Sequence, residues 1–175
     1  MNLSSENNQK FRWSVANKLE INANADEVWK TISTAGNLAN CHPFCRKNPV
    51  KQWGGVGSQD SIFYYSGLVL YRNFTHWIDG VGYDLEIAER KGNNMSRVSW
   101  RIFPKGDKSE LLMAIQPYHL QDMLLIPRWF AHYSYLRPTV KKYIISVLKG
   151  FDWYISTGKP VDRNQFGSHK WFSPN

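Results

Sequence analysis

The chain has 175 residues, which fits a single domain with a sizeable core, and 42% of the residues are hydrophobic. The formal net charge is +8, but Lys and Arg are scattered and form no long run of like charges, which argues against a dedicated nucleic-acid-binding segment. The N-terminus lacks the apolar core of a signal peptide, and no apolar run approaches the roughly 18 residues of a membrane span. We therefore expect a soluble cytoplasmic protein that binds no specific nucleic acid, although its basic surface permits peripheral contact with acidic membranes.

Two cysteines, Cys41 and Cys45, lie in the segment CHPFC. A single closely spaced pair is not a disulfide framework, and His42 does not complete a zinc-binding spacing. We expect reduced thiols, no bound metal and no cofactor. His42 follows a predicted short helix near one end of the domain, where either a structural cap or a ligand contact is open.

The first part of the chain predicts a strand followed by two short helices. Apolar and polar residues alternate from Trp13 to Ile21, as in a half-buried strand. Asn24 and Glu27 have the spacing of a helix-capping box, and the segment GNLANCHPF indicates a second helical turn.

About six further strands follow, separated by turns at hairpin spacing. The runs LVLYRNFTHWID, YDLEIAER, MSRVSWRIFP and SELLMAIQPYH are bounded by glycine-containing turns such as Gly80-Val81-Gly82 and Gly106-Asp107. The fold class indicated by this order is α+β, with a curved antiparallel sheet of about seven strands.

Residues 137–157 predict a long amphipathic helix. Its apolar residues recur at the i, i+3, i+4, i+7 spacing of one buried stripe. Pro138 suits a first helical turn, and Gly158 followed by Pro160 is a stop signal. A helix of this length spans on the order of 30 Å and requires a broad apolar surface to cover it. We expect the sheet to supply that surface.

Residues 118–136 are less regular, because Pro127 interrupts an apolar segment. Either a lid over one end of the sheet or an amphipathic connector packed against the long helix agrees with this pattern.

Several motifs, in order, resemble the START-like (SRPBCC) superfamily, the helix-grip fold of Bet v 1-like proteins and polyketide cyclases. They are LEINANADEVWKTIS (19–33), LANCHPF (38–44), GGVGSQDSIFY (54–64) and VLKGFDWYISTG (147–158). The resemblance implies a sheet wrapped around the C-terminal helix, with a cavity between them for a hydrophobic or amphipathic molecule. It divides the chain into a flexible segment at 1–11, a single ligand-binding domain at 12–158 and a tail at 159–175.

Strand parity selects candidate site residues, since alternate side chains share one face. Arg72 and His76 share the parity of Phe74, on the face expected to point inward. Arg72 is either a counter-ion for an acidic ligand or the partner of a protein carboxylate. His76 is either an acid–base group or a single hydrogen-bond donor, unless a bulge turns it outward.

The remaining predicted ligand-binding residues are apolar or aromatic side chains of the same inward face and of the long helix. They are Tyr64, Phe74, Tyr83, Leu85, Ile87, Trp100, Ile102, Met113 and Ile115 from the strands, and Ile144, Leu148 and Phe151 from the helix.

The resemblance does not by itself decide the activity, because the superfamily includes carriers, hormone receptors, cyclases and co-chaperones. The favoured prediction is a carrier or sensor that encloses a lipid-like or polyketide-like molecule. The alternative is a cyclase or dehydratase with His76 and Arg72 as candidate catalytic residues. A protein-interaction or membrane-surface module is a third possibility. The sequence does not define an oligomeric state.

Overall fold

The computed structural model describes residues 14–89, 95–118 and 132–175. The predictions of a flexible segment at 1–11 and of a lid within 118–136 fall wholly or mostly outside these residues.

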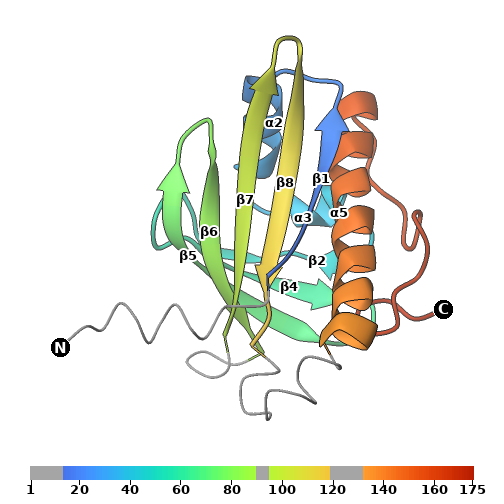
Figure 1. Ribbon diagram of the computed structural model, residues 1–175. Helices are drawn as coiled ribbons and strands as arrows, with labels where there is room; N and C mark the ends of the chain where they lie inside the picture. Colours follow the sequence, from blue (N-terminus) through green and yellow to red (C-terminus); the bar gives the residue numbers. More distant parts are fainter. Residues whose placement is uncertain (1–13, 90–94, 119–131) are drawn as a thin grey trace.

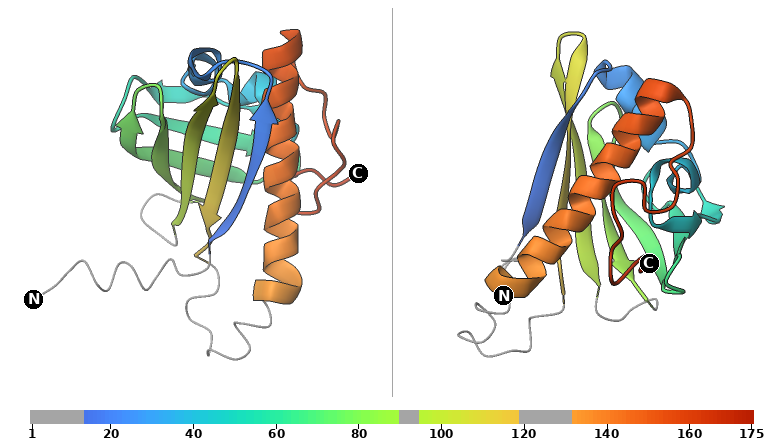
Figure 2. Two further views of the ribbon diagram at one scale, coloured as in Figure 1. Left: turned by 45° about the horizontal axis from the view of Figure 1, so that its top comes forward. Right: turned by 90° about the vertical axis from the view of Figure 1, so that its right-hand side faces the viewer.

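One antiparallel sheet forms the body of the protein, with strand order β1-β8-β7-β6-β5-β4-β2 and a further strand, β3, paired with β4. Figure 1 shows the long strands beside the C-terminal helix, and Figure 2 shows that helix crossing the sheet. The eight strands are β1 (Val15–Ile21), β2 (Cys45–Lys47), β3 (Val50–Gln52), β4 (Gln59–Tyr64), β5 (Val69–Ile78), β6 (Gly82–Ala88), β7 (Ser96–Lys105) and β8 (Lys108–Gln116). The predicted α+β helix-grip architecture is therefore confirmed.

Two short helices follow β1, as the sequence predicts. In α2 (Ala25–Ile32), the Asn24 side chain accepts the Glu27 N–H at 3.0 Å, which satisfies one free donor at the helix start. The second helix, α3 (Leu38–Cys41), approaches the C-terminal helix so closely that a Cβ at Gly150 would lie 2.1 Å from the Cys41 carbonyl oxygen.

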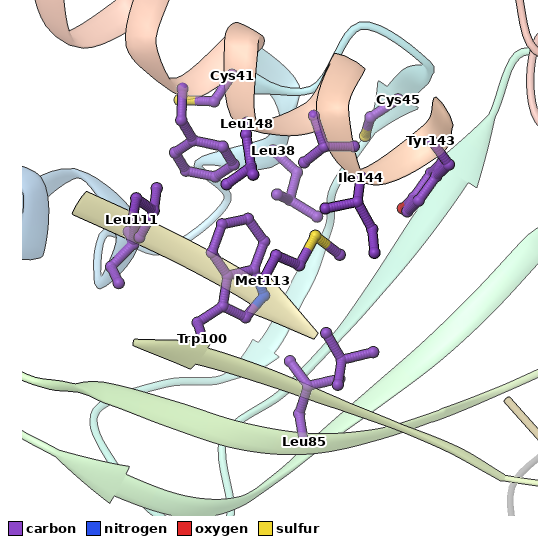
Figure 3. Close-up of a cluster of buried hydrophobic side chains, with 14 of the residues drawn as sticks. Leu38, Cys41, Cys45, Leu85, Trp100, Leu111, Met113, Tyr143, Ile144 and Leu148 are labelled. Carbon is purple, nitrogen blue, oxygen red and sulfur yellow. The ribbon is translucent and has the colours of Figure 1, made fainter. Parts of the chain in front are cut away.

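The C-terminal helix α5 (Arg137–Thr157) follows a π-helical turn, η1 (His132–Leu136), and ends at Gly158, whose φ of 67° is left-handed. Its predicted apolar stripe is buried, including Val140, Ile144 and Phe151. In Figure 3, Ile144 and Leu148 face the strand residues Trp100 and Met113 across the core.

Residues 159–175 fold back onto the domain. The Val161 N–H donates to the Asn40 carbonyl at 2.9 Å, and the Ser66 N–H donates to the Phe172 carbonyl at 3.0 Å. The tail therefore packs beside α3 and the turn after β4. Figure 2 shows the tail, in red, returning beside α5.

A bulge in β5 changes which of its side chains point inward. Phe74 pairs with Leu85 but His76 pairs with Asp84, so Thr75 is an extra residue in the ladder. His76 has a side chain 73% exposed, whereas Trp77 packs in the aromatic core. The prediction that His76 faces inward is wrong, because it assumed unbroken alternation along this strand.

Candidate functional site

A cavity of about 510 Å³ lies between the sheet and the first half of α5. Most of its wall is apolar. The strands and the residues directly next to them contribute Ile62, Tyr64, Leu68, Leu70, Arg72, Leu85, Ile87, Ala88, Glu89, Ser96, Val98, Trp100, Met113, Ile115 and Pro117. The other elements contribute Leu38, His42, Leu136, Val140, Tyr143, Val147, Trp171 and Phe172.

Half of the predicted ligand-binding residues line this cavity: Tyr64, Arg72, Leu85, Ile87, Trp100, Met113 and Ile115. Six others, Phe74, Tyr83, Ile102, Ile144, Leu148 and Phe151, are buried in the packed core instead. They share the inward face with the lining residues but are enclosed by neighbouring core side chains.

Many lining residues were not among the predicted ones, including the strand-side residues Ile62, Leu68, Leu70 and Val98 and two groups from α5 and the tail. Val140, Tyr143 and Val147 belong to the predicted stripe of α5, where they alternate with the packed residues Ile144 and Leu148. Trp171 and Phe172 lie in the tail, where no helical or strand periodicity marks them as inward-facing. The aromatic content of the tail was the available signal.

Arg72 reaches the cavity wall already paired with a carboxylate. Its Nε donates to Asp60 Oδ1 at 2.6 Å and its Nη2 donates to Asp60 Oδ2, and both residues are buried. The Asn48 side-chain amide also donates to Asp60, at 3.0 Å. Burial disfavours the guanidinium charge, but Asp60 outweighs this effect and keeps the pKa of Arg72 above its ordinary value. Arg72 was predicted to be either a counter-ion for an acidic ligand or the partner of a protein carboxylate. In the structure it is the partner of a protein carboxylate, that of Asp60.

A second polar group in the wall consists of His42, Tyr64 and Tyr143, here called the polar trio. His42 Nε2 lies 2.9 Å from Tyr143 Oη, which lies 3.1 Å from Tyr64 Oη. The Phe44 N–H donates to His42 Nδ1 at 3.1 Å. Three separate elements supply the trio: the segment after α3, the end of β4 and the second turn of α5.

Burial determines the protonation of the polar trio. It lowers the pKa of His42 to about 3, with the nearby Arg72 charge acting in the same direction. Burial also raises the pKa of Tyr143 to about 12 and that of Tyr64 well above its ordinary value. At neutral pH all three are uncharged. Because Nδ1 accepts from Phe44, the His42 proton is assigned to Nε2, which donates to Tyr143.

The two cysteines contribute no reactive group to the site. Both are buried free thiols, and burial raises the pKa of each to about 12. Within residues 14–89, 95–118 and 132–175, no cluster of three or more His, Cys, Asp or Glu is arranged to hold a metal ion. None of the helices in those ranges is long and apolar enough to cross a membrane.

No protein-family model and no curated protein matches this sequence. Solved structures do match it. DynU16, a protein from the dynemicin biosynthetic locus, superposes with a TM-score of 0.64 at 13% identity, covering 85% of this chain and 49% of DynU16. The di-domain ARO/CYC BexL from the BE-7585A biosynthetic pathway gives 0.63 at 9% identity, with 82% and 46% covered.

A third match, Ara h 8.0201, gives a TM-score of 0.61 at 10% identity, covering 82% of this chain and 97% of that protein. The chain thus spans about half the length of DynU16 and BexL and nearly all of Ara h 8.0201. At these identities the likeness is one of fold. The protein has the Bet v 1-like helix-grip fold, which is the fold that the order of its sequence motifs predicted.

Proposed function

We propose that the protein binds a hydrophobic or amphipathic small molecule in the cavity between the sheet and α5, as a carrier or sensor. The observation that supports this most strongly is the cavity itself. Its volume of about 510 Å³ lies within the range of small-molecule sites, roughly 300–1,000 Å³, and its wall is mostly apolar.

The few polar groups of the wall agree with such a ligand. The polar trio and the Arg72–Asp60 pair converge near β4 and β5, while β6, β7 and β8 supply mainly aliphatic and aromatic side chains. An apolar wall with a few placed polar groups favours a ligand with an apolar body and a small polar end.

A displacement titration tests this proposal. The neutral dye N-phenyl-1-naphthylamine should bind the protein with increased fluorescence and should be displaced by hydrophobic competitors. Native mass spectrometry of gently purified protein would reveal a co-purified molecule.

A matched pair of variants locates the dye. Val140→Phe adds a ring to the cavity wall and should weaken dye binding, whereas Val56→Phe makes the same change at a residue 66% exposed and should not. If the wild-type protein is folded but binds no displaceable dye, the proposal is wrong.

A second candidate is an enzyme of the cyclase or dehydratase kind, favoured by the likeness to BexL and by the hydroxyl groups of the polar trio within the cavity. His76 is not available for this role, because its side chain lies outside the cavity. The test is dehydration of 4-hydroxy-4-phenyl-2-butanone to the enone, followed by absorbance. Turnover that falls about 10²-fold or more in Tyr143→Phe would support the enzyme, and an absence of turnover would exclude this reaction.

A further inference from the structure

The polar trio lies in the cavity wall and is held firmly by its neighbours. The Phe172 ring lies 4.6 Å from the rings of both Tyr64 and Tyr143, between centroids. The Phe44 ring stacks on Tyr143 at 5.9 Å. The two tyrosines that carry the hydroxyl groups are therefore held in place in the cavity wall.

Counting hydrogens shows that the polar trio has one donor more than it uses. The Phe44 N–H, the His42 Nε2–H and the two tyrosine hydroxyls supply four hydrogens in total. Only three contacts join these groups, and each contact uses one hydrogen. Whichever tyrosine donates to the other, one hydroxyl hydrogen is left over.

Within the described residues, no protein group beyond this chain of contacts hydrogen-bonds to either hydroxyl. A buried donor without a partner destabilises a protein, so an acceptor supplied by the ligand would be favoured at this place.

The charges around the cavity indicate what kind of acceptor fits. In the described part of the wall, the side chains of the Arg, Lys, His, Asp and Glu types are His42, Arg72 and Glu89. His42 is neutral, Arg72 is matched by Asp60, and Glu89 is acidic. A carboxylate would lose its hydration without meeting an unmatched positive charge, whereas an uncharged carbonyl loses far less on burial.

We propose that the cavity selects hydrophobic molecules that carry an uncharged carbonyl oxygen, and that a hydroxyl of Tyr64 or Tyr143 donates a hydrogen bond to that oxygen. This inference depends on the proposed binding function and specifies the ligand's polar group. The remaining wall contacts the apolar body of the ligand and sets no further requirement for charge.

The test uses three rigid probes that share one ring system: fluorene, 9-fluorenone and 9-fluorenecarboxylate. Their dissociation constants are measured by displacement of N-phenyl-1-naphthylamine from the full chain at pH 7. Comparing the ratio of the fluorenone and fluorene constants between variants cancels differences in hydrophobicity and in general packing.

The variant His42→Leu/Tyr64→Phe/Tyr143→Phe removes every side-chain donor of the polar trio. His42 is included because loss of the Tyr143 hydroxyl would otherwise free its Nε2–H, and Phe44, whose N–H then loses its acceptor, is not a wall residue. The ratio of the fluorenone dissociation constant to the fluorene dissociation constant should rise about fivefold, the value expected for one lost neutral hydrogen bond. Tyr83→Phe is the matched control, because Tyr83 is equally buried but lies outside the cavity wall. It should leave the ratio unchanged.

Infrared spectroscopy of fluorenone bound to the wild-type protein gives a readout that needs no variant. Its carbonyl stretching band should lie below the frequency found in an apolar solvent, as hydrogen bonding requires. A band at the apolar-solvent frequency overturns the inference. So does an unchanged ratio in a folded triple variant, or binding of 9-fluorenecarboxylate as tight as that of fluorenone. Binding of none of the probes, nor of the dye, overturns the proposed function as well.

Discussion

His42 is a buried, uncharged histidine, and this state links the stability of the protein to pH. Its pKa in the folded state is lowered to about 3, below the ordinary 6.5 of the unfolded chain. The unfolded state therefore takes up a proton that the folded state does not. The stabilisation is present above pH 6.5 and is lost progressively as the pH falls toward 3.

We therefore expect the free energy of unfolding to fall by about 2 kcal/mol between pH 7 and pH 5 through this residue, since each bound proton contributes about 1.4 kcal/mol per pH unit. The variant His42→Asn keeps an acceptor for the Phe44 N–H and does not titrate. It should be less stable at pH 7 but should lose less stability on acidification. Urea unfolding at both pH values measures this, and equal losses in both proteins would contradict it.

The Arg72–Asp60 pair is the main buried ion pair at the cavity wall, with side-chain exposures of 4% and 0%. Removing one partner leaves an uncompensated buried charge, so Arg72→Met should destabilise the protein by about 3–5 kcal/mol. Replacing both, as Arg72→Met with Asp60→Leu, should recover most of this loss. Asn48 retains its bond to the Ser61 carbonyl, at 2.9 Å, in that double variant.

Denaturant unfolding of the single and double variants decides this prediction. A double variant no more stable than Arg72→Met would show that the pair contributes more than mutual compensation of charge.

At the level of elements, Gly150 allows α5 to pack directly against the end of α3 and the segment that follows it. Alanine in a helix interior is ordinarily more stable than glycine, by about 1 kcal/mol. Here its Cβ would lie 2.1 Å from the Cys41 carbonyl oxygen and 3.1 Å from Pro43 Cδ. We expect Gly150→Ala to lower the free energy of unfolding by about 2 kcal/mol, because overpacking outweighs helix propensity. A thermal midpoint at or above that of the wild type would contradict this.

The tail is a second element whose packing can be tested. Phe172 is half-buried against Tyr64 and Tyr143 and forms part of the cavity wall. Phe172→Ala should cost about 2 kcal/mol, less than the roughly 3–5 kcal/mol of a fully buried phenylalanine, and should speed release of bound dye.

Phe103→Ala, at a residue of β7 that is 46% exposed and outside the cavity wall, is the matched control. Stopped-flow dilution measures the release rate. Equal rates in the two variants would show that the tail does not limit ligand exchange.

The bulge in β5 explains why parity alone could not locate the site. From residue 68 to Phe74 the alternation predicts the inward face correctly, including the burial of Arg72. After Thr75 the parity reverses, so Trp77 takes the inward place that had been given to His76. No Gly or Pro marks this position in the sequence, and the extra residue is visible only in the pairing with β6.

At the scale of the whole molecule, periodicity, turn residues and the order of motifs were sufficient for the fold. The buried stripe of α5 and the capping of α2 by Asn24 follow directly from local spacing. The division between cavity and packed core could not be predicted from spacing, because it runs along the stripe of α5: Tyr143 and Val147 line the cavity, whereas Ile144 and Leu148 are packed in the core. Val140 and Phe151 share one stripe, yet only Val140 lines the cavity.

Ligand binding should stabilise the whole domain, since the cavity exists only in the folded state. At a free concentration of 100 times its dissociation constant, 9-fluorenone should raise the free energy of unfolding by about 2.7 kcal/mol. Thermal unfolding with and without the probe measures this increase. An unchanged midpoint at saturating dye displacement would indicate binding outside the folded core.

The position of Trp171 and Phe172 in the cavity wall has a consequence for how the protein is made. Translation delivers the N-terminal part of a chain first, at about 5–20 residues per second. The inner face of the sheet is therefore synthesised well before the aromatic residues that complete its enclosure. A nascent chain that has not yet reached residue 171 already contains the strands and α5 but lacks these two residues of the cavity wall, so the wall is completed only when the tail is in place.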